Sequence, residues 1–172
     1  PQFESVDLNI NFNIPAFHKS IVIPNGDIYV VGGCDGEDPN KKMNTTFLYD
    51  WGKQSLIPKA KMSVGRSSFG ICYMNRYIWV VGGLTNNSTY TRTCEKYDTL
   101  TNKWTQIADI NHEILAPCVT SFNNKYLFKF GGCGVDDRLE PIVEKYDPSR
   151  NVWTVLNVKI DIPASIKPGY FK

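Results

Sequence analysis

Short apolar runs recur along the chain, and each ends in a pair of glycines. In the first two runs the positions on both alternating faces are apolar, which predicts strands covered by protein on both sides. An asparagine stands seven positions before the first glycine of each pair, and Asn25-Gly26 is a strong signal for a two-residue hairpin turn. The pattern therefore predicts repeated hairpins, with strands at residues 28–31, 78–81 and 127–130.

The glycine pairs follow one another at steps of 50 and 49 residues: Gly32-Gly33, Gly82-Gly83 and Gly131-Gly132. A period of this size predicts a repeat architecture. Glycine at a strand end accepts positive φ and lets another group approach the main chain closely. Downstream of each pair a Tyr-Asp dipeptide recurs, and in the second and third units a tryptophan follows it: Tyr49, Tyr97 and Tyr146, then Trp104 and Trp153. In the first unit Leu56 stands where the tryptophan is expected.

This series of glycine pair, Tyr-Asp and tryptophan resembles the kelch repeat, whose units are four-stranded blades of a β-propeller. The resemblance implies an all-β fold, an arc of about three four-stranded antiparallel blades within a larger propeller. It also implies that the tryptophan ring of the outer strand lies against the glycine pair of its own blade. The glycines, tyrosines and tryptophans of the series are thus expected to be structural.

Residues 13–16 recur as residues 161–164, a shift of 148 residues, or three steps of about 49. We therefore expect repeats at about 15–64, 65–113 and 114–162 within one kelch segment, 1–172. Residues 1–14 would end a preceding blade and residues 163–172 would begin a following one. Three blades leave two open sheet faces, so further blades or partner subunits are expected at both ends.

The charge is nearly balanced, at +2 from 19 basic and 17 acidic residues, and the basic residues are scattered. This argues against a nucleic-acid partner. No apolar run is long enough to insert into a membrane. Five cysteines without a C-x-x-C pair favour free thiols, and hence an intracellular protein, cytoplasmic or cytoskeleton-associated. Glycosylation-type sequons at Asn44 and Asn87 favour secretion instead.

The sequence predicts no catalytic, cofactor or metal site. No helical pattern follows a glycine pair, as a phosphate-binding loop requires, and His18 and His112 lack neighbours at zinc-ligand spacing. Cys34 and Cys133 follow glycine pairs where the middle unit has a leucine, so they are interpreted as small buried hydrophobes. Lys129 breaks the apolar pattern of its strand; it either snorkels to water or lines the propeller channel.

In propellers that this chain resembles, loops on one face carry recognition, as loops on a rigid scaffold commonly do. The candidate partner-binding residues lie in loops after the glycine pairs: Asp35, Glu37, Asp38, Asn86, Tyr90, Asp136, Asp137 and Arg138. Arg66 and Ser67 are further candidates between blades, because Arg66-Ser67-Ser68 resembles the loops with which kelch adaptors of ubiquitin ligases hold acidic peptides. Their equivalents are taken to be Ala16-Phe17-His18 and Leu115-Ala116-Pro117. The acidic loops nearby favour a mixed or basic partner.

The predicted function is a non-catalytic protein-interaction or scaffold module, such as a substrate adaptor or a subunit of a large intracellular assembly. The alternative is part of a propeller enzyme, an oxidase or hydrolase, whose catalytic residues lie outside this segment. Fold alone does not decide between the two.

Overall fold

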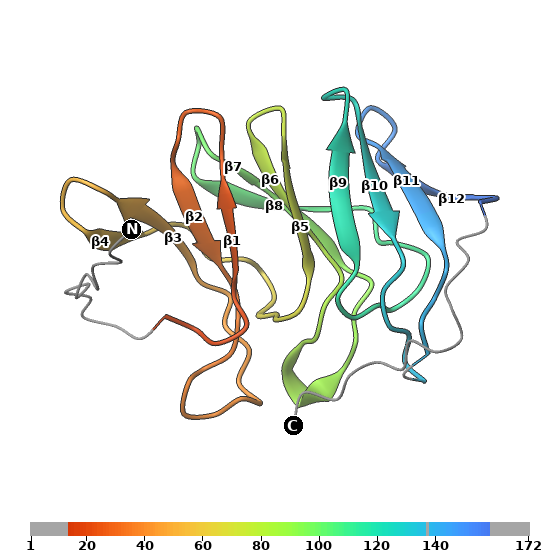
Figure 1. Cartoon of the computed structure of the whole chain (residues 1–172), viewed down its shortest axis with the longest axis horizontal. Helices are drawn as coiled ribbons and strands as arrows, with labels where there is room; N and C mark the ends of the chain where they lie inside the picture. The colour runs from red at the N-terminus through yellow and green to blue at the C-terminus, as the bar shows by residue number, and fades with distance from the viewer. Residues whose placement is uncertain (1–13, 137, 159–172) are drawn as a thin grey trace, which may run out of the picture.

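The computed structural model of the chain describes residues 14–136 and 138–158. They form three separate four-stranded antiparallel sheets, each ordered as in the sequence (Figure 1). The strands are β1 (Lys19–Val22), β2 (Ile28–Val31), β3 (Thr46–Asp50) and β4 (Ser55–Pro58); β5 (Gly70–Met74), β6 (Tyr77–Val81), β7 (Cys94–Asp98) and β8 (Lys103–Ile107); and β9 (Cys118–Phe122), β10 (Tyr126–Phe130), β11 (Val143–Asp147) and β12 (Val152–Leu156). A 3-10 turn, η1 (Asn86–Ser88), is the one helical element of the described residues. The all-β prediction of three kelch-type blades is confirmed.

The three sheets stand side by side as blades 1, 2 and 3, and the first strands β1, β5 and β9 are neighbours (Figure 1). Each blade has an upstream face toward the preceding blade and a downstream face toward the following one. The apolar core lies between these faces, so the middle strands are covered on both sides. This explains why both alternating faces of β2 and β6 are apolar.

The core between blades 1 and 2 is built from the second and third strands. Tyr29 and Val31 on the downstream face of blade 1 pack with Ile78, Val80 and Tyr97 on the upstream face of blade 2. The rings of Tyr29 and Tyr97 meet edge to face, with centroids 5.7 Å apart. Such aromatic pairs add stability beyond the area they bury.

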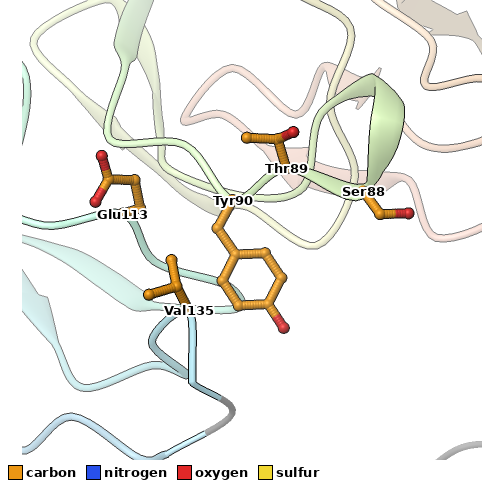
Figure 2. A pocket seen from close by; sticks show the side chains of 5 residues that line it. All are labelled: Ser88, Thr89, Tyr90, Glu113 and Val135. Carbon is orange, nitrogen blue, oxygen red and sulfur yellow. The ribbon is translucent and has the colours of Figure 1, made fainter.

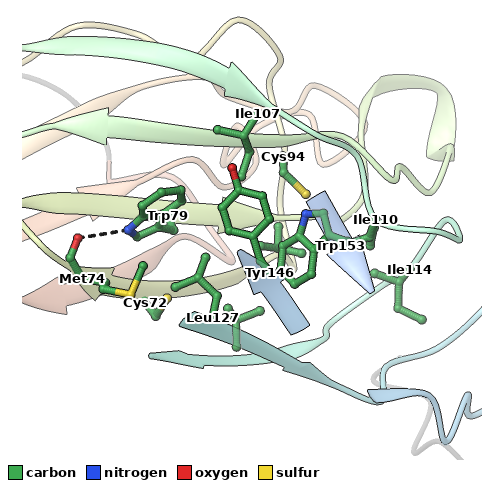
Figure 3. Close-up of a cluster of buried hydrophobic side chains, with 12 residues drawn as sticks. Cys72, Met74, Trp79, Cys94, Ile107, Ile110, Ile114, Leu127, Tyr146 and Trp153 are labelled. Atoms are coloured by element: carbon green, nitrogen blue, oxygen red, sulfur yellow. Dashed lines mark hydrogen bonds between the residues drawn. The ribbon is translucent and has the colours of Figure 1, made fainter. Parts of the chain in front are cut away.

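The same positions build the core between blades 2 and 3 (Figure 3). Trp79 of blade 2 packs on Tyr146 of blade 3, with ring centroids 5.6 Å apart. Its indole N–H donates to the carbonyl of Met74 at 3.1 Å, so the one polar group of this buried ring has a partner. Leu127 and Trp153 complete the blade 3 side.

The outer-strand tryptophans reach across to the preceding blade. The indole N–H of Trp153 donates to the carbonyl of Ala108 at 3.0 Å, and that of Trp104 donates to the carbonyl of Ala60 at 3.0 Å. The prediction that each tryptophan lies against the glycine pair of its own blade is therefore wrong. Each indole ring is held by a hydrogen bond to a backbone carbonyl, of Ala60 or Ala108, in the segment that follows the last strand of the preceding blade.

The glycine pairs are crowded instead by the loops between blades. A Cβ added at Gly83 would lie 2.8 Å from the Cβ of Phe69, and one at Gly132 would lie 2.4 Å from a methylene carbon of Ile114. Both glycines have left-handed φ, +104° and +119°. The predicted close approach to the main chain is confirmed, but the approaching group is the inter-blade loop.

In blades 2 and 3, an asparagine at a left-handed turn joins the tyrosine of the Tyr-Asp pair to the preceding blade. The Tyr146 hydroxyl donates to Oδ1 of Asn151 at 2.7 Å, and the same oxygen accepts the Ala108 N–H at 2.9 Å. Asn102 makes the equivalent bonds in blade 2, to the Tyr97 hydroxyl and the Ala60 N–H. We call this set of tyrosine, asparagine and tryptophan contacts the blade clamp. Blade 1 has Leu56 in place of the tryptophan.

The aspartates of the Tyr-Asp pairs close local turns, as predicted. The Asp147 carboxylate accepts the Ser149 N–H at 3.0 Å and its hydroxyl at 2.7 Å. The hydroxyl bond is the largest cause of an Asp147 pKa below its ordinary value. Asp98 accepts the Leu100 N–H at 3.0 Å in the same way.

Candidate functional site

Three loops project from one end of the blades, at the lower edge of Figure 1. They are the loops that follow the glycine pairs, residues 34–42, 84–90 and 133–140, and each is closed at its base by a β-bridge. We call this end the loop face. The sequence had placed the loops on a common face, and the topology agrees, because the second strand of every blade runs toward that end.

The first loop largely satisfies its own charges. Asp35 and Lys41 form an ion pair at 2.9 Å, and Asp35 also accepts the Glu37 N–H at 3.0 Å. The Lys41 hydrogen bond is the main cause of an Asp35 pKa below its usual range. Asp38 accepts the Asn40 N–H at 3.0 Å. These bonds hold the loop's shape, and the side chains of Glu37 and Asp38 remain exposed.

The second loop is tied to the first. Oδ1 of Asn86 accepts the Lys42 N–H at 2.7 Å, a contact between residues of neighbouring blades. The Thr85 hydroxyl donates to the carbonyl of Thr89 at 2.9 Å, across the short turn η1. Asn86, a predicted partner-binding residue, therefore positions its loop against the neighbouring one.

An open groove of about 550 Å³ lies between the second and third loops (Figure 2). The side chains of Tyr90 and Val135 give it an apolar part, and Val135 is 71% exposed. Glu113, from the segment between blades 2 and 3, supplies an exposed carboxylate. Ser88 and Thr89 line the remaining side. Of these residues, only Tyr90 is among the partner-binding candidates predicted from the sequence.

The third loop carries a second local ion pair beside Val135. Nε of Arg138 lies 3.3 Å from Oδ2 of Asp136, and both side chains are more than half exposed. Such pairs contribute little to stability. Both groups therefore stay accessible on the loop face. Asp137, the remaining predicted residue of this loop, lies outside the described residues.

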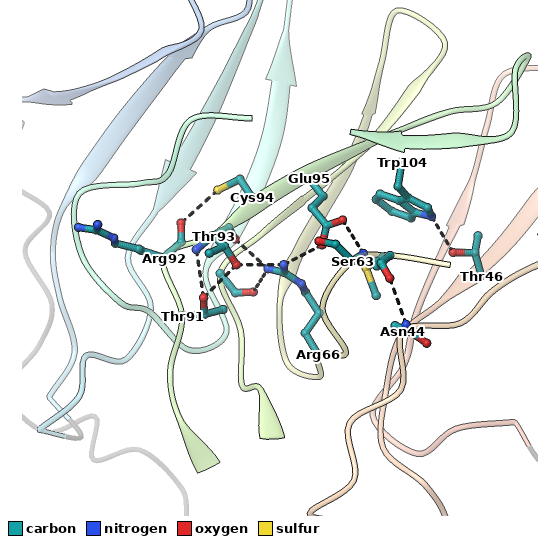
Figure 4. A network of polar contacts seen from close by, with 12 residues as sticks. Asn44, Thr46, Ser63, Arg66, Thr91, Arg92, Thr93, Cys94, Glu95 and Trp104 are labelled. Carbon is teal, nitrogen blue, oxygen red and sulfur yellow. Dashed lines mark hydrogen bonds and ion pairs between the residues drawn. The ribbon is translucent and has the colours of Figure 1, made fainter. Parts of the chain in front are cut away.

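Arg66 and Ser67 are buried, so the prediction that they face a partner is corrected. Arg66 is 0% exposed (Figure 4). One of its terminal nitrogens donates to the carbonyls of Gly82 and Thr93, and the other lies 3.0 Å from Glu95 Oε1. Burial lowers the Arg66 pKa from its ordinary value, and the Glu95 charge opposes this. The guanidinium links the loop before blade 2 to the interior of that blade.

The structure also corrects which residues are equivalent to Arg66. The carbonyl of Arg66 accepts the Gly33 N–H at 2.8 Å, and the carbonyl of Ile114 accepts the Gly83 N–H at 2.8 Å. Ile114 therefore occupies the Arg66 position in the next unit, where Leu115 had been expected. The alignment was displaced by one residue because no glycine or aromatic residue marks this loop in all units.

Lys129 is also 0% exposed, so neither predicted role, snorkelling or lining a channel, is correct. Its ammonium lies 3.4 Å from Oε1 of Glu144, which is fully buried. The other oxygen of Glu144 accepts the Asn111 N–H at 3.1 Å. Glu95 holds the equivalent Ser63 N–H at 2.8 Å, with Arg66 as its cation. Both glutamates thus fix the segment that leaves the preceding blade.

The described residues hold no group of metal-ligating side chains. No disulfide joins the five cysteines, all within the described part of the chain. Cys34 is buried as predicted, whereas Cys133 is half-buried. Burial raises the pKa of Cys72 and of Cys94 to about 12, so neither thiol is a nucleophile near neutral pH. Among these residues, no helix has the length and apolar character of a membrane span.

The side-chain amide of Asn44 is engaged within the fold. Its Nδ2 donates to the carbonyl of Met62 at 3.1 Å (Figure 4). This hydrogen bond gives the Asn44 side chain a structural role in the fold.

Comparison with known proteins finds a match to the family model described as Kelch motif, over residues 15–53 and 65–111. Kelch-like protein 41a of Danio rerio is 37% identical over 94 residues, which cover 55% of this chain and 15% of that protein. Kelch-like protein 15 of Homo sapiens is 31% identical over 93 residues, 53% of this chain and 15% of the relative. Kelch repeat and BTB domain-containing protein 2 of Horsepox virus is 23% identical over 139 residues, 68% of this chain and 25% of the relative. The chain thus spans no more than a quarter of the length of these relatives.

Proposed function

Because the chain belongs to the kelch-repeat family, we propose that it is a non-catalytic protein-interaction module whose loop face binds a protein partner. Within a longer protein it would serve as an adaptor or scaffold segment. A relative that carries a BTB domain beside its kelch repeats supports the adaptor role. The five free thiols, three of them buried, fit an intracellular location.

The observation that carries the proposal is the groove between the second and third loops. It places an aromatic ring and an exposed aliphatic side chain beside a carboxylate. Protein interfaces combine such apolar anchors with a charged rim. The groove therefore fits a partner segment with an apolar side chain next to a lysine or arginine, in agreement with the basic or mixed partner predicted from the acidic loops.

The buried charges of the described residues have structural roles. Arg66 pairs with Glu95, and Lys129 pairs with Glu144, and each glutamate also holds a backbone N–H. Charges satisfied in this way are not poised for proton transfer or nucleophilic attack. Within residues 14–136 and 138–158, no observation favours the propeller-enzyme alternative.

Site-specific photocrosslinking tests the proposal. A benzophenone amino acid at Val135 is expected to crosslink a protein partner in cells. The same label at Leu100, which is 74% exposed in the turn at the opposite end of blade 2, is the matched control. A specific adduct from position 135 that is absent from position 100 supports the loop face. The reverse pattern would place binding elsewhere and contradict the proposal.

A further inference from the structure

The first and second loops of the loop face close against each other through three residues. Oδ1 of Asn86 in the second loop accepts the Lys42 N–H at the end of the first loop, at 2.7 Å. Gly65, in the segment between the two blades, lies beside this contact, and a Cβ added to it would clash with the Lys42 carbonyl oxygen. The junction between these two loops therefore has no room for a side chain at position 65.

The junction between the second and third loops lacks this closing hydrogen bond. Tyr90 closes the base of the second loop by a β-bridge, as Lys42 closes the base of the first. Val135 stands three positions after the second glycine of its pair, as Asn86 does. Since the valine side chain has no acceptor, it cannot repeat the bond that Asn86 makes. The open groove therefore lies where the first junction is closed (Figure 2).

Glu113 occupies the third of these positions, that of Gly65. Each of the two residues precedes the one whose carbonyl accepts a glycine N–H from the preceding blade. The open junction accommodates the glutamate side chain, which is exposed and lines the groove. All three positions that close the first junction thus carry groove-lining side chains in the second.

The arginines near the groove already have carboxylate partners. Nε of Arg92 lies 3.3 Å from Oδ2 of Asp109, and Nε of Arg138 lies 3.3 Å from Oδ2 of Asp136. Among the described residues no lysine or arginine forms an ion pair with Glu113. The Glu113 carboxylate is therefore available to a cation from outside the chain.

We propose that this groove binds an arginine side chain of the partner, with its methylene groups on Val135 and the Tyr90 ring and its guanidinium on the Glu113 carboxylate. The inference rests on the proposed function and names the side chain that the loop face recognises. The three lining residues supply an aliphatic surface, an aromatic ring and a negative charge. An arginine side chain complements all three.

Other side chains match the groove less well. An aliphatic residue would cover the Glu113 carboxylate without pairing it, which is costly, and an acidic residue would meet a like charge. Lysine would place a strongly hydrated ammonium in the groove. A guanidinium is more weakly hydrated, stacks on aromatic rings and binds a carboxylate through two parallel N–H groups.

NMR titration of the chain with three short peptides tests the assignment. The probes are the acetylated, amidated dipeptides Leu-Arg, Leu-Lys and Leu-citrulline, and citrulline keeps the shape of arginine without its charge. The Leu-Arg probe is expected to shift the signals of Val135 and Tyr90 and to bind about threefold more tightly than the Leu-Lys probe. The citrulline probe should show no saturable shift.

Two variants identify the carboxylate and the groove. Glu113→Gln should weaken the Leu-Arg probe at least about fivefold. Asp27→Asn, in the β1–β2 turn at the opposite end of the blades, removes the same charge and should bind the probe as wild type does. The double variant Glu113→Gly/Val135→Asn copies the closed junction and should lose the probe shifts while its strand amide signals stay in place.

Equal affinities for the Leu-Arg and Leu-Lys probes would overturn the assignment, and so would Leu-Arg binding that Glu113→Gln leaves unchanged. Probe binding that appears only after Arg138→Gln would assign the groove to the chain's own arginine. Groove signals that shift with protein concentration alone would assign it to a second copy. The proposed function is tested separately by the crosslink from Val135. A retained crosslink with equal probe affinities would therefore reject the arginine and leave binding at the loop face in place.

Discussion

Glu95 and Glu144 stand at one position of two successive blades, yet their cations come from different places. Glu95 receives Arg66 from the inter-blade loop, where blade 3 has Ile114. Glu144 receives Lys129 from the second strand, where blade 2 has Val80. The cation therefore comes from the inter-blade loop in blade 2 and from the second strand in blade 3, but it pairs with the equivalent glutamate in both. A buried carboxylate without a cation is strongly destabilising, which explains why one of the two positions is always basic in these blades.

Lys129→Val should therefore destabilise the chain by about 3–5 kcal/mol, because it leaves Glu144 buried and unpaired. Adding Ile114→Arg copies the arrangement of blade 2 and should restore most of the loss. Urea unfolding of wild type, the single variants and the double variant measures both effects. A double variant less stable than Lys129→Val would show that the two positions do not serve the same carboxylate.

At the scale of elements, the blade clamp joins blade 2 to blade 1 and blade 3 to blade 2. Asn151 has two tasks, since it adopts φ of 51° and its side chain accepts two hydrogen bonds. Glycine adopts the same φ without the side chain, so substitution by glycine separates the tasks. If the hydrogen bonds of the blade clamp stabilise the fold, Asn151→Gly lowers the free energy of unfolding. If Asn151 serves only the turn geometry, the substitution changes it little.

Asn151→Gly should lower the free energy of unfolding by about 1–3 kcal/mol, the cost of leaving buried groups unsatisfied. Asn123→Gly is the matched control, because Asn123 has φ of 52° in an exposed hairpin turn. Its change should stay within about 0.5 kcal/mol. Equal effects of the two substitutions in chemical denaturation would mean that the clamp bonds contribute nothing.

Trp153→Ala should cost about 3–5 kcal/mol, since the ring is buried between blades 2 and 3 and donates to Ala108. Trp51, which is 68% exposed, provides the comparison. Its replacement by alanine should cost less than about 1 kcal/mol. Calorimetric unfolding of both variants measures the difference. A small effect at Trp153 would contradict the blade packing described above.

The strands, the repeat and the fold class were predictable because they depend on local signals: apolar alternation, asparagine turns and glycine pairs. The contacts that the repeat residues make with neighbouring blades were not predictable from the sequence. Trp153 and Ala108 are 45 residues apart in sequence, and the contact joins two blades. The burial of Arg66 depended on Glu95 in the same way, and most groove residues come from loops that carry no repeated pattern.

For the whole molecule, burial of ionisable groups predicts a loss of stability at high pH. Burial raises the pKa of Cys72 and Cys94 from 9.0 to about 12, and that of Tyr146 to about 12. The folded state thus keeps the thiols neutral while the unfolded chain ionises above pH 9.0. This contribution is fully present below pH 9.0 and is lost as the pH rises toward about 12.

Unfolding free energies should therefore fall as the pH rises from about 9 toward about 12. The double variant Cys72→Ala/Cys94→Ala should show a shallower fall, and Cys118→Ser, at an exposed thiol, should leave the slope unchanged. Denaturation curves at several pH values measure the slopes. A slope that is the same with and without the two buried thiols would contradict this assignment.

In the whole molecule, the interior joins the blades, and the loop face is the surface that we propose binds a protein partner. The most direct measurement is calorimetric titration of the partner captured at position 135 with wild type, Val135→Asp and the control Leu100→Asp. The account predicts at least about tenfold weaker binding, or about 1.4 kcal/mol, for Val135→Asp, with an unchanged melting temperature. Leu100→Asp should bind as wild type does. Unchanged affinity in Val135→Asp, or equal loss in both variants, would contradict binding at the loop face.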